Sequence, residues 1–155
     1  MNNDMIKTYS YRISQATRSQ LVVITYDIIT DYLNEALSEE TDSGYKEKLH
    51  MAMRGIDQLI TGLDMKYDIS VQLYQLYNYM KRTLISAQVA GERDSVSRII
   101  TMLGKLRASF LEVSHLDTSQ PLMKNTEKVY SGLTYSRYGA NETAQDTLGN
   151  RGYKV

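Results

Sequence analysis

The chain contains no cysteine and only one proline among its 155 residues. Without cysteine it can form no disulfide bond, no thiolate metal site and no cysteine nucleophile. The single proline, Pro121, follows every segment with helical periodicity, so no proline interrupts a helix before it. These absences fit a helical protein from a reducing compartment.

An excess of charge of one sign is also missing, because eighteen Lys and Arg balance eighteen Asp and Glu. Without a basic run, the sequence gives no reason to expect nucleic acid or an acidic membrane as a partner. No apolar stretch is long enough to span a bilayer, and residues 1–11 lack the continuous apolar run of a secretory signal. We therefore expect a cytoplasmic protein without membrane insertion.

Helical periodicity is the strongest positive signal. In four windows apolar residues recur at i, i+3, i+4 and i+7. These windows are 21–37, 49–63, 69–87 and 96–113. Because short links between long helices make neighbours antiparallel, we predict an all-α, up-down-up-down four-helix bundle. The bundle domain is expected to span residues 1–117, with an N-terminal segment before the first helix.

Residues that cap helices set the predicted starts. Thr17 and Gln20 have the spacing of a capping box, which predicts a first helix from Arg18 to about Leu37. Asp68 and Asp94 are candidate N-caps of the third and fourth helices, because a carboxylate accepts hydrogen bonds from unpaired N–H groups there.

The remaining segment, residues 118–155, is a polar tail rich in Asn, Thr, Gly and Tyr without helical periodicity. It has little apolar surface to offset the entropy of ordering it, which favours a flexible tail. An alternative is a segment that folds back on the bundle through tyrosines such as Tyr130 and Tyr135. We therefore predict an irregular C-terminal tail, either flexible or folded back.

Two Glu-x-x-His motifs, Glu47 to His50 and Glu112 to His115, resemble the ligand pairs of di-iron helical bundles. Both motifs lie on polar helix faces. In the predicted topology they would lie at opposite ends, about 25 Å apart by helix rise. The third helix also offers no interior glutamate. We predict no metal centre and no cofactor.

Catalytic patterns are equally weak. Asp27 and Asp31 lie one turn apart, and paired carboxylates can do acid–base chemistry, but we interpret them as solvated helix-surface acids. Both histidines are expected to be exposed, and no Gly-rich phosphate loop is present. We predict that the protein is not an enzyme.

Two of the predicted helices have apolar residues beyond one stripe. On the first helix these are Val22, Tyr26, Ile29 and Leu33. On the third helix they are Val71, Tyr74, Tyr79 and Ile85. One interpretation is a wide core or a covering N-terminal segment. The other is a hydrophobic groove for the amphipathic helix of a partner.

Several segments resemble the FliS family of flagellar export chaperones. Residues 21–27, LVVITYD, resemble the family's ELVLMLYDG, and residues 73–87, LYQLYNYMKRTLISA, are similar to its LxxLYDYMxRRLxEA helix. Residues 62–64 resemble its SLD, and residues 103–110 its LLxELRDAW. The resemblance covers about residues 9–115. Lys81 and Phe110 stand where the family has arginine and tryptophan, which indicates a divergent member.

The resemblance implies a cytoplasmic chaperone for flagellin. It would bind the disordered C-terminal segment of flagellin, prevent premature polymerisation and keep flagellin competent for flagellar type III export. The export gate is a further candidate partner. The resemblance also implies that Tyr9, Tyr11 and Ile13 cover part of the client groove when no client is bound.

Combining both lines, the candidate client-binding residues are Tyr9, Tyr11, Ile13, Val22, Tyr26, Ile29, Leu33, Val71, Tyr74, Tyr77 and Ile85. The alternative function is a structural helical bundle that self-associates through the same apolar stripes. The sequence leaves the oligomeric state open.

Overall fold

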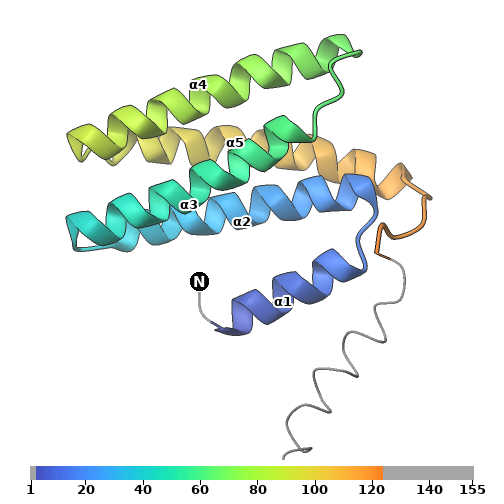
Figure 1. The fold of residues 1–155 in the computed structure, drawn as a ribbon, viewed down its shortest axis with the longest axis horizontal. Helices are drawn as coiled ribbons and strands as arrows, with labels where there is room; N and C mark the ends of the chain where they lie inside the picture. Colours follow the sequence, from blue (N-terminus) through green and yellow to red (C-terminus); the bar gives the residue numbers. More distant parts are fainter. Residues whose placement is uncertain (1–2, 124–155) are drawn as a thin grey trace, which may run out of the picture. The chain divides into compact units, whose positions relative to one another are not determined.

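The computed structural model describes residues 3–123, which form five α-helices and no strand (Figure 1). The helices are α1 (Asn3–Ser14), α2 (Arg18–Ser38), α3 (Asp42–Thr61), α4 (Asp68–Ala90) and α5 (Asp94–Leu116). The all-α class is confirmed, but the structure has one helix more than predicted. The extra helix, α1, occupies the N-terminal segment, to which the sequence assigned no helix.

The starts of the helices agree with the predicted caps only in part. Thr17 is the N-cap of α2, and both hydrogen bonds of the predicted capping box with Gln20 are present. Asp68 and Asp94 are not N-caps; they are the first residues of α4 and α5. Their carboxylates lie in the first turn, where the positive end of the helix dipole favours negative charge.

The core lies among α2, α3, α4 and α5. α2 packs against α3 and α5, and α4 also contacts both α3 and α5. α1 packs on α2, and Ser14 is its one buried residue. The largest fully buried side chains are Tyr26, Ile29, Leu33, Leu49, Ile56, Tyr77, Met80, Leu84, Val96, Ile99 and Leu103.

A glycine permits the close approach of α2 and α3. A Cβ atom at Gly55 would lie 2.4 Å from Cγ1 of Ile29, which is closer than carbon atoms can approach without a shift. The missing side chain therefore lets the two helices with the most extensive mutual packing approach each other.

Arg93 links two loops, 39–41 and 91–93. Its guanidinium donates hydrogen bonds of 2.6 Å to the backbone carbonyls of Leu37 and Glu39, at the C-terminal end of α2. It also lies over the ring of Tyr45, whose hydroxyl donates to the carbonyl of Glu92. A cation at a helix C-terminus satisfies carbonyls that have no intrahelical partner.

The segment after α5 lies on the junction between α1 and α2. The Asp117 carboxylate accepts hydrogen bonds from the backbone N–H and the hydroxyl of Ser19, and Leu122 N–H donates to the Ala16 carbonyl at 3.1 Å. Residues 118–123 have no helix or strand. Tyr130 and Tyr135 lie outside the described residues.

Candidate client-binding surfaces

The predicted second stripe on α2 does not form an open surface. Tyr26, Ile29 and Leu33 are fully buried, and Val22 is half-buried against the core. These three side chains therefore belong to the core, as in the wide-core interpretation, and their part in client binding stays a prediction. The physical reason is that α2 has α3 on one side and α5 on the other, so both of its apolar stripes are covered.

Tyr77 on α4 is also a core residue. Its hydroxyl forms a hydrogen bond with the hydroxyl of Tyr26, and the Tyr26 ring lies 5.6 Å from the ring of Phe110. Burial, and then the contact with Tyr77, raise the pKa of Tyr26, so both hydroxyls stay protonated. The pair gives two buried polar groups a partner in an apolar core.

The three predicted residues of the N-terminal segment divide between two faces of α1. Tyr9 and Ile13 are four residues apart, lie on one face and are half-buried. Tyr11 is two residues from each, lies on the opposite face and is 60% exposed. Because the segment is helical, Tyr11 cannot cover the surface on which Tyr9 and Ile13 pack.

Asp27 joins three helices. Its carboxylate accepts hydrogen bonds from Arg12 of α1, at 2.6 Å, and from Arg107 of α5, while its own side chain is only 14% exposed. Burial raises the pKa of Asp27, but the hydrogen bonds and charges of the two arginines outweigh it, so the pKa lies below its usual value. The interpretation of Asp27 as a solvated surface acid is wrong.

Polar contacts fasten α1 to α2. Besides the Arg12–Asp27 pair, the Tyr9 hydroxyl donates to the Asp31 carboxylate at 2.5 Å, and the Arg12 guanidinium lies 5.4 Å from the centre of the Tyr9 ring. Asp31 thus also has a hydrogen-bond partner on α1.

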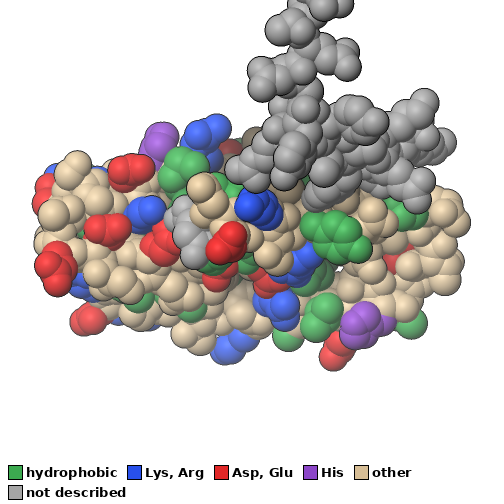
Figure 2. Space-filling model, turned by 90° about the horizontal axis from the view of Figure 1, so that it is seen from below, with side chains coloured by type: hydrophobic (Ala, Val, Ile, Leu, Met, Phe, Trp, Pro, Cys, Tyr) green, Lys and Arg blue, Asp and Glu red, His purple; other side chains and the backbone are tan. Residues whose placement is uncertain are grey.

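Figure 2 shows the molecule from below relative to the view of Figure 1. On this face acidic and basic side chains are interspersed with scattered hydrophobic ones.

An exposed apolar stripe remains on α4. Val71, Tyr74 and Ile85 are 40%, 44% and 46% exposed, and Val89 on the same flank is still more exposed. The spacing of these residues places them on one side of the helix. We call the four exposed residues Val71, Tyr74, Ile85 and Val89 the α4 stripe.

The α4 stripe lies beside α3. The Lys81 ammonium on this flank binds the Asp57 carboxylate at 2.5 Å, and the Gln88 amide donates to the Lys46 carbonyl at 3.3 Å. Tyr79, also on α4 and 49% exposed, lies on the opposite flank. Val89 was missed by the sequence reasoning, although its position four residues after Ile85 was the signal that could have found it.

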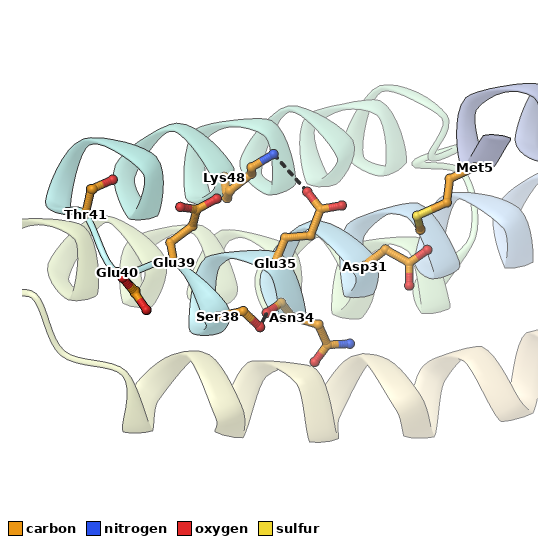
Figure 3. A pocket seen from close by; sticks show the side chains of 9 residues that line it. All are labelled: Met5, Asp31, Asn34, Glu35, Ser38, Glu39, Glu40, Thr41 and Lys48. Atoms are coloured by element: carbon orange, nitrogen blue, oxygen red, sulfur yellow. Dashed lines mark hydrogen bonds and ion pairs between the residues drawn. The ribbon is translucent and has the colours of Figure 1, made fainter. Parts of the chain in front are cut away.

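A cavity of about 730 Å³ lies between α1, the C-terminal half of α2 and the start of α3 (Figure 3). The lining residues are Met5, Asp31, Asn34, Glu35, Ser38, Glu39, Glu40, Thr41 and Lys48. Lys48 binds Glu35 at 2.9 Å. The lining is mostly polar and includes none of the predicted client-binding residues, so this cavity differs from the expected groove.

The side chains that could support chemistry are dispersed. Glu47, His50, Glu112 and His115 are all exposed. Within residues 3–123, no three His, Asp or Glu side chains come together as a possible metal site. No helix in this range has the length and apolarity to cross a membrane.

Within residues 3–123, five helices define an all-α protein in which polar contacts attach α1 and an apolar stripe on α4 is exposed. The model of the family described as Flagellar protein FliS matches residues 1–117. The chain therefore belongs to the FliS family of flagellar export chaperones, whose members are chaperones and are not known as enzymes. No curated protein matches the sequence.

Proposed function

We propose that this chain is a cytoplasmic export chaperone that binds the disordered C-terminal segment of flagellin. Binding would prevent premature polymerisation and keep flagellin competent for flagellar type III export, with the export gate as a further candidate partner. Membership of the FliS family supports the proposal, and residues 1–117 are proposed as the chaperone domain.

The observation on which the proposal depends is the α4 stripe. Three large apolar side chains on one flank of α4 remain about half exposed, although the core residues of the same helix are buried. They are Val71, Tyr74 and Ile85. A disordered client that folds as it binds buries roughly 1,000–3,000 Å² and loses several kcal/mol to ordering. Such a client needs an apolar surface that is already formed, and the α4 stripe supplies one.

We infer that α2 to α5 run antiparallel, as expected for a four-helix bundle. The contacts between α3 and α4 support this, because Lys81 pairs with Asp57 whereas the later residue Gln88 pairs with the earlier residue Lys46. Links of three residues at 39–41 and 91–93 also favour a reversal of direction.

We assign different roles to the predicted residues according to their burial. Val71, Tyr74 and Ile85 would contact the client directly. Tyr9 and Ile13 would act on α1, which covers part of the surface until a client displaces it. Val22, half-buried on α2, would contact the client at the edge of the core. Four predicted residues lie in the core and would support the surface from beneath: Tyr26, Ile29, Leu33 and Tyr77.

Two tyrosines on α4 provide a matched test. Tyr74 belongs to the α4 stripe, whereas Tyr79 is similarly exposed on the other flank. We expect Tyr74→Ala to weaken binding of the last fifty or so residues of a flagellin from the same cell about tenfold, and Tyr79→Ala to leave it unchanged. A tenfold loss corresponds to about 1.4 kcal/mol, an ordinary cost for removing an interface tyrosine. Isothermal titration calorimetry measures both.

If the unmodified protein does not bind this segment, the proposal is wrong. The alternative, a self-associating structural bundle, uses the same exposed stripe and predicts a stable oligomer. Light scattering would then report an oligomer that Tyr74→Ala dissociates and that has no affinity for the flagellin segment.

A further inference from the structure

Two arginines lie on the outer surface of α3 and α4, next to the α4 stripe. Arg82 follows Lys81 on α4, and Arg54 precedes Asp57 by one turn on α3. Because Lys81 binds Asp57, the two arginines lie at the same level along the paired helices. Both are rotated from these facing positions toward solvent, and both are exposed.

These two arginines differ from their neighbours in having no carboxylate partner within residues 3–123. Lys81 is paired with Asp57, and Lys46 with Asp42. Arg54 makes only a 4.0 Å contact with the sulfur of Met51. The face formed by α3 and α4 therefore presents two unpaired cations, at Arg54 and Arg82.

The arginines lie between the two ends of the stripe. Val71 and Tyr74 form one apolar pair, and Ile85 and Val89 form a second. Eleven residues separate Tyr74 from Ile85, which is about 16 Å along a helix. Arg82 and Arg54 lie at the level between the two pairs, near the second.

From this arrangement we propose that the α3–α4 face binds an acidic amphipathic segment, with apolar anchors at both ends and carboxylates between them. The proposal rests on the proposed function and specifies the kind of client sequence held at that surface. A partner helix lying along α4 would place its two apolar clusters about eleven residues apart. Its intervening Asp or Glu side chains would pair with Arg82 and Arg54.

The charge requirement follows from desolvation. A partner that covered the stripe would take the guanidinium groups partly out of water, and an unpaired buried charge is costly. A carboxylate removes that cost, because it accepts two parallel N–H donors from one guanidinium. Opposite charge also accelerates the encounter, so association should be faster at low salt. A basic or neutral partner would gain neither advantage.

The test uses the full chain and the C-terminal segment of a flagellin from the same cell as probe. The double variant R54Q/R82Q removes both charges while keeping long polar side chains. Lys105, an exposed cation on α5 away from this face, supplies the control K105Q. At about 50 mM salt, where screening is weak, we expect R54Q/R82Q to bind at least tenfold more weakly and K105Q less than twofold more weakly.

The salt dependence is a second readout that a merely structural effect would not change. Raising the salt to about 300 mM should weaken binding by the unmodified protein and have little effect on R54Q/R82Q. Circular dichroism should show that both variants keep the helix content and melting temperature of the unmodified protein.

The outcomes separate this inference from the function on which it rests. If the unmodified protein fails to bind the probe, the proposed function itself is wrong. If the probe binds and R54Q/R82Q behaves like K105Q, the acidic-segment inference is overturned and the chaperone function stands. If light scattering shows a dimer that R54Q/R82Q dissociates, the face binds a second copy and the inference is likewise overturned.

Discussion

At the scale of single residues, Asp27 is a carboxylate that joins three helices. It lies on α2, and its partners Arg12 and Arg107 come from α1 and α5. The pKa of Asp27 is lowered in the folded protein, because the two arginines outweigh the effect of burial. A carboxylate with a lowered folded pKa stabilises the fold above its unfolded pKa, about 3.9, and loses this contribution as the pH falls toward the folded value.

We therefore expect Asp27→Asn to be less stable than the unmodified protein by about 2 kcal/mol at neutral pH, the scale of a charged hydrogen bond. The difference should be constant above about pH 5 and shrink as the pH falls below about 4. Urea unfolding followed by circular dichroism at several pH values measures it. Asp57→Asn, which removes an exposed carboxylate, should cost less than about 1 kcal/mol. A pH-independent difference for Asp27→Asn would contradict the assigned role.

The partners of Asp27 could not be predicted from the sequence. The spacing of Asp27 and Asp31 on one helix face gave no sign of Tyr9, Arg12 or Arg107, which come from sequence-distant segments. Ion pairs of this kind depend on how helices pack, and periodicity within one helix does not encode that. The capping box at Thr17, in contrast, depends on four consecutive residues, and the sequence predicted it correctly.

At the scale of elements, α1 is the helix that periodicity failed to reveal. It spans Asn3–Ser14, contacts the rest of the described chain largely through polar groups, and buries only Ser14. α1 is short and mostly polar, so its few apolar residues cover fewer helical turns than those of the four predicted windows. For α2 the sequence showed both apolar stripes, but it did not show that α3 and α5 would cover both of them. Whether an apolar stripe is covered by a neighbouring helix depends on tertiary packing.

The mainly polar attachment of α1 leads to a prediction. Deleting residues 1–14 should leave the helices α2 to α5 folded, since the core includes no α1 side chain. It should tighten binding of the flagellin C-terminal segment several-fold, because the client no longer has to displace a cover. Calorimetric titration measures the affinity, and circular dichroism the fold.

Lys7→Ala is the control for this deletion, because Lys7 is an exposed residue of α1. It should leave the affinity unchanged. An unaltered affinity after the deletion would show that α1 does not cover the client site.

At the scale of the whole described molecule, the sequence predicted the all-α class and four of the five helices. It also predicted most of the core, because that core follows from repeated apolar spacing. The burial of the individual candidate residues could not be predicted in the same way. Of the candidates on α2 and α4, those that stay open are Val71, Tyr74 and Ile85, while Tyr26 and Tyr77 lie inside. A stripe that faces a neighbouring helix and one that faces solvent have the same spacing in the sequence.

The buried pair of Tyr26 and Tyr77 joins α2 to α4 through the centre of the core, so it reports on the packing of the whole bundle. Tyr77→Phe removes one hydroxyl and leaves that of Tyr26 buried without a partner, which should destabilise the protein by about 1–3 kcal/mol. The double variant Y26F/Y77F replaces both hydroxyls with apolar groups of similar shape, and its stability should return toward that of the unmodified protein. Urea unfolding of the two single variants and the double variant gives the coupling energy between them. Additive losses would mean that the two hydroxyls act independently, whereas recovery in the double variant would show that each is needed mainly to satisfy the other.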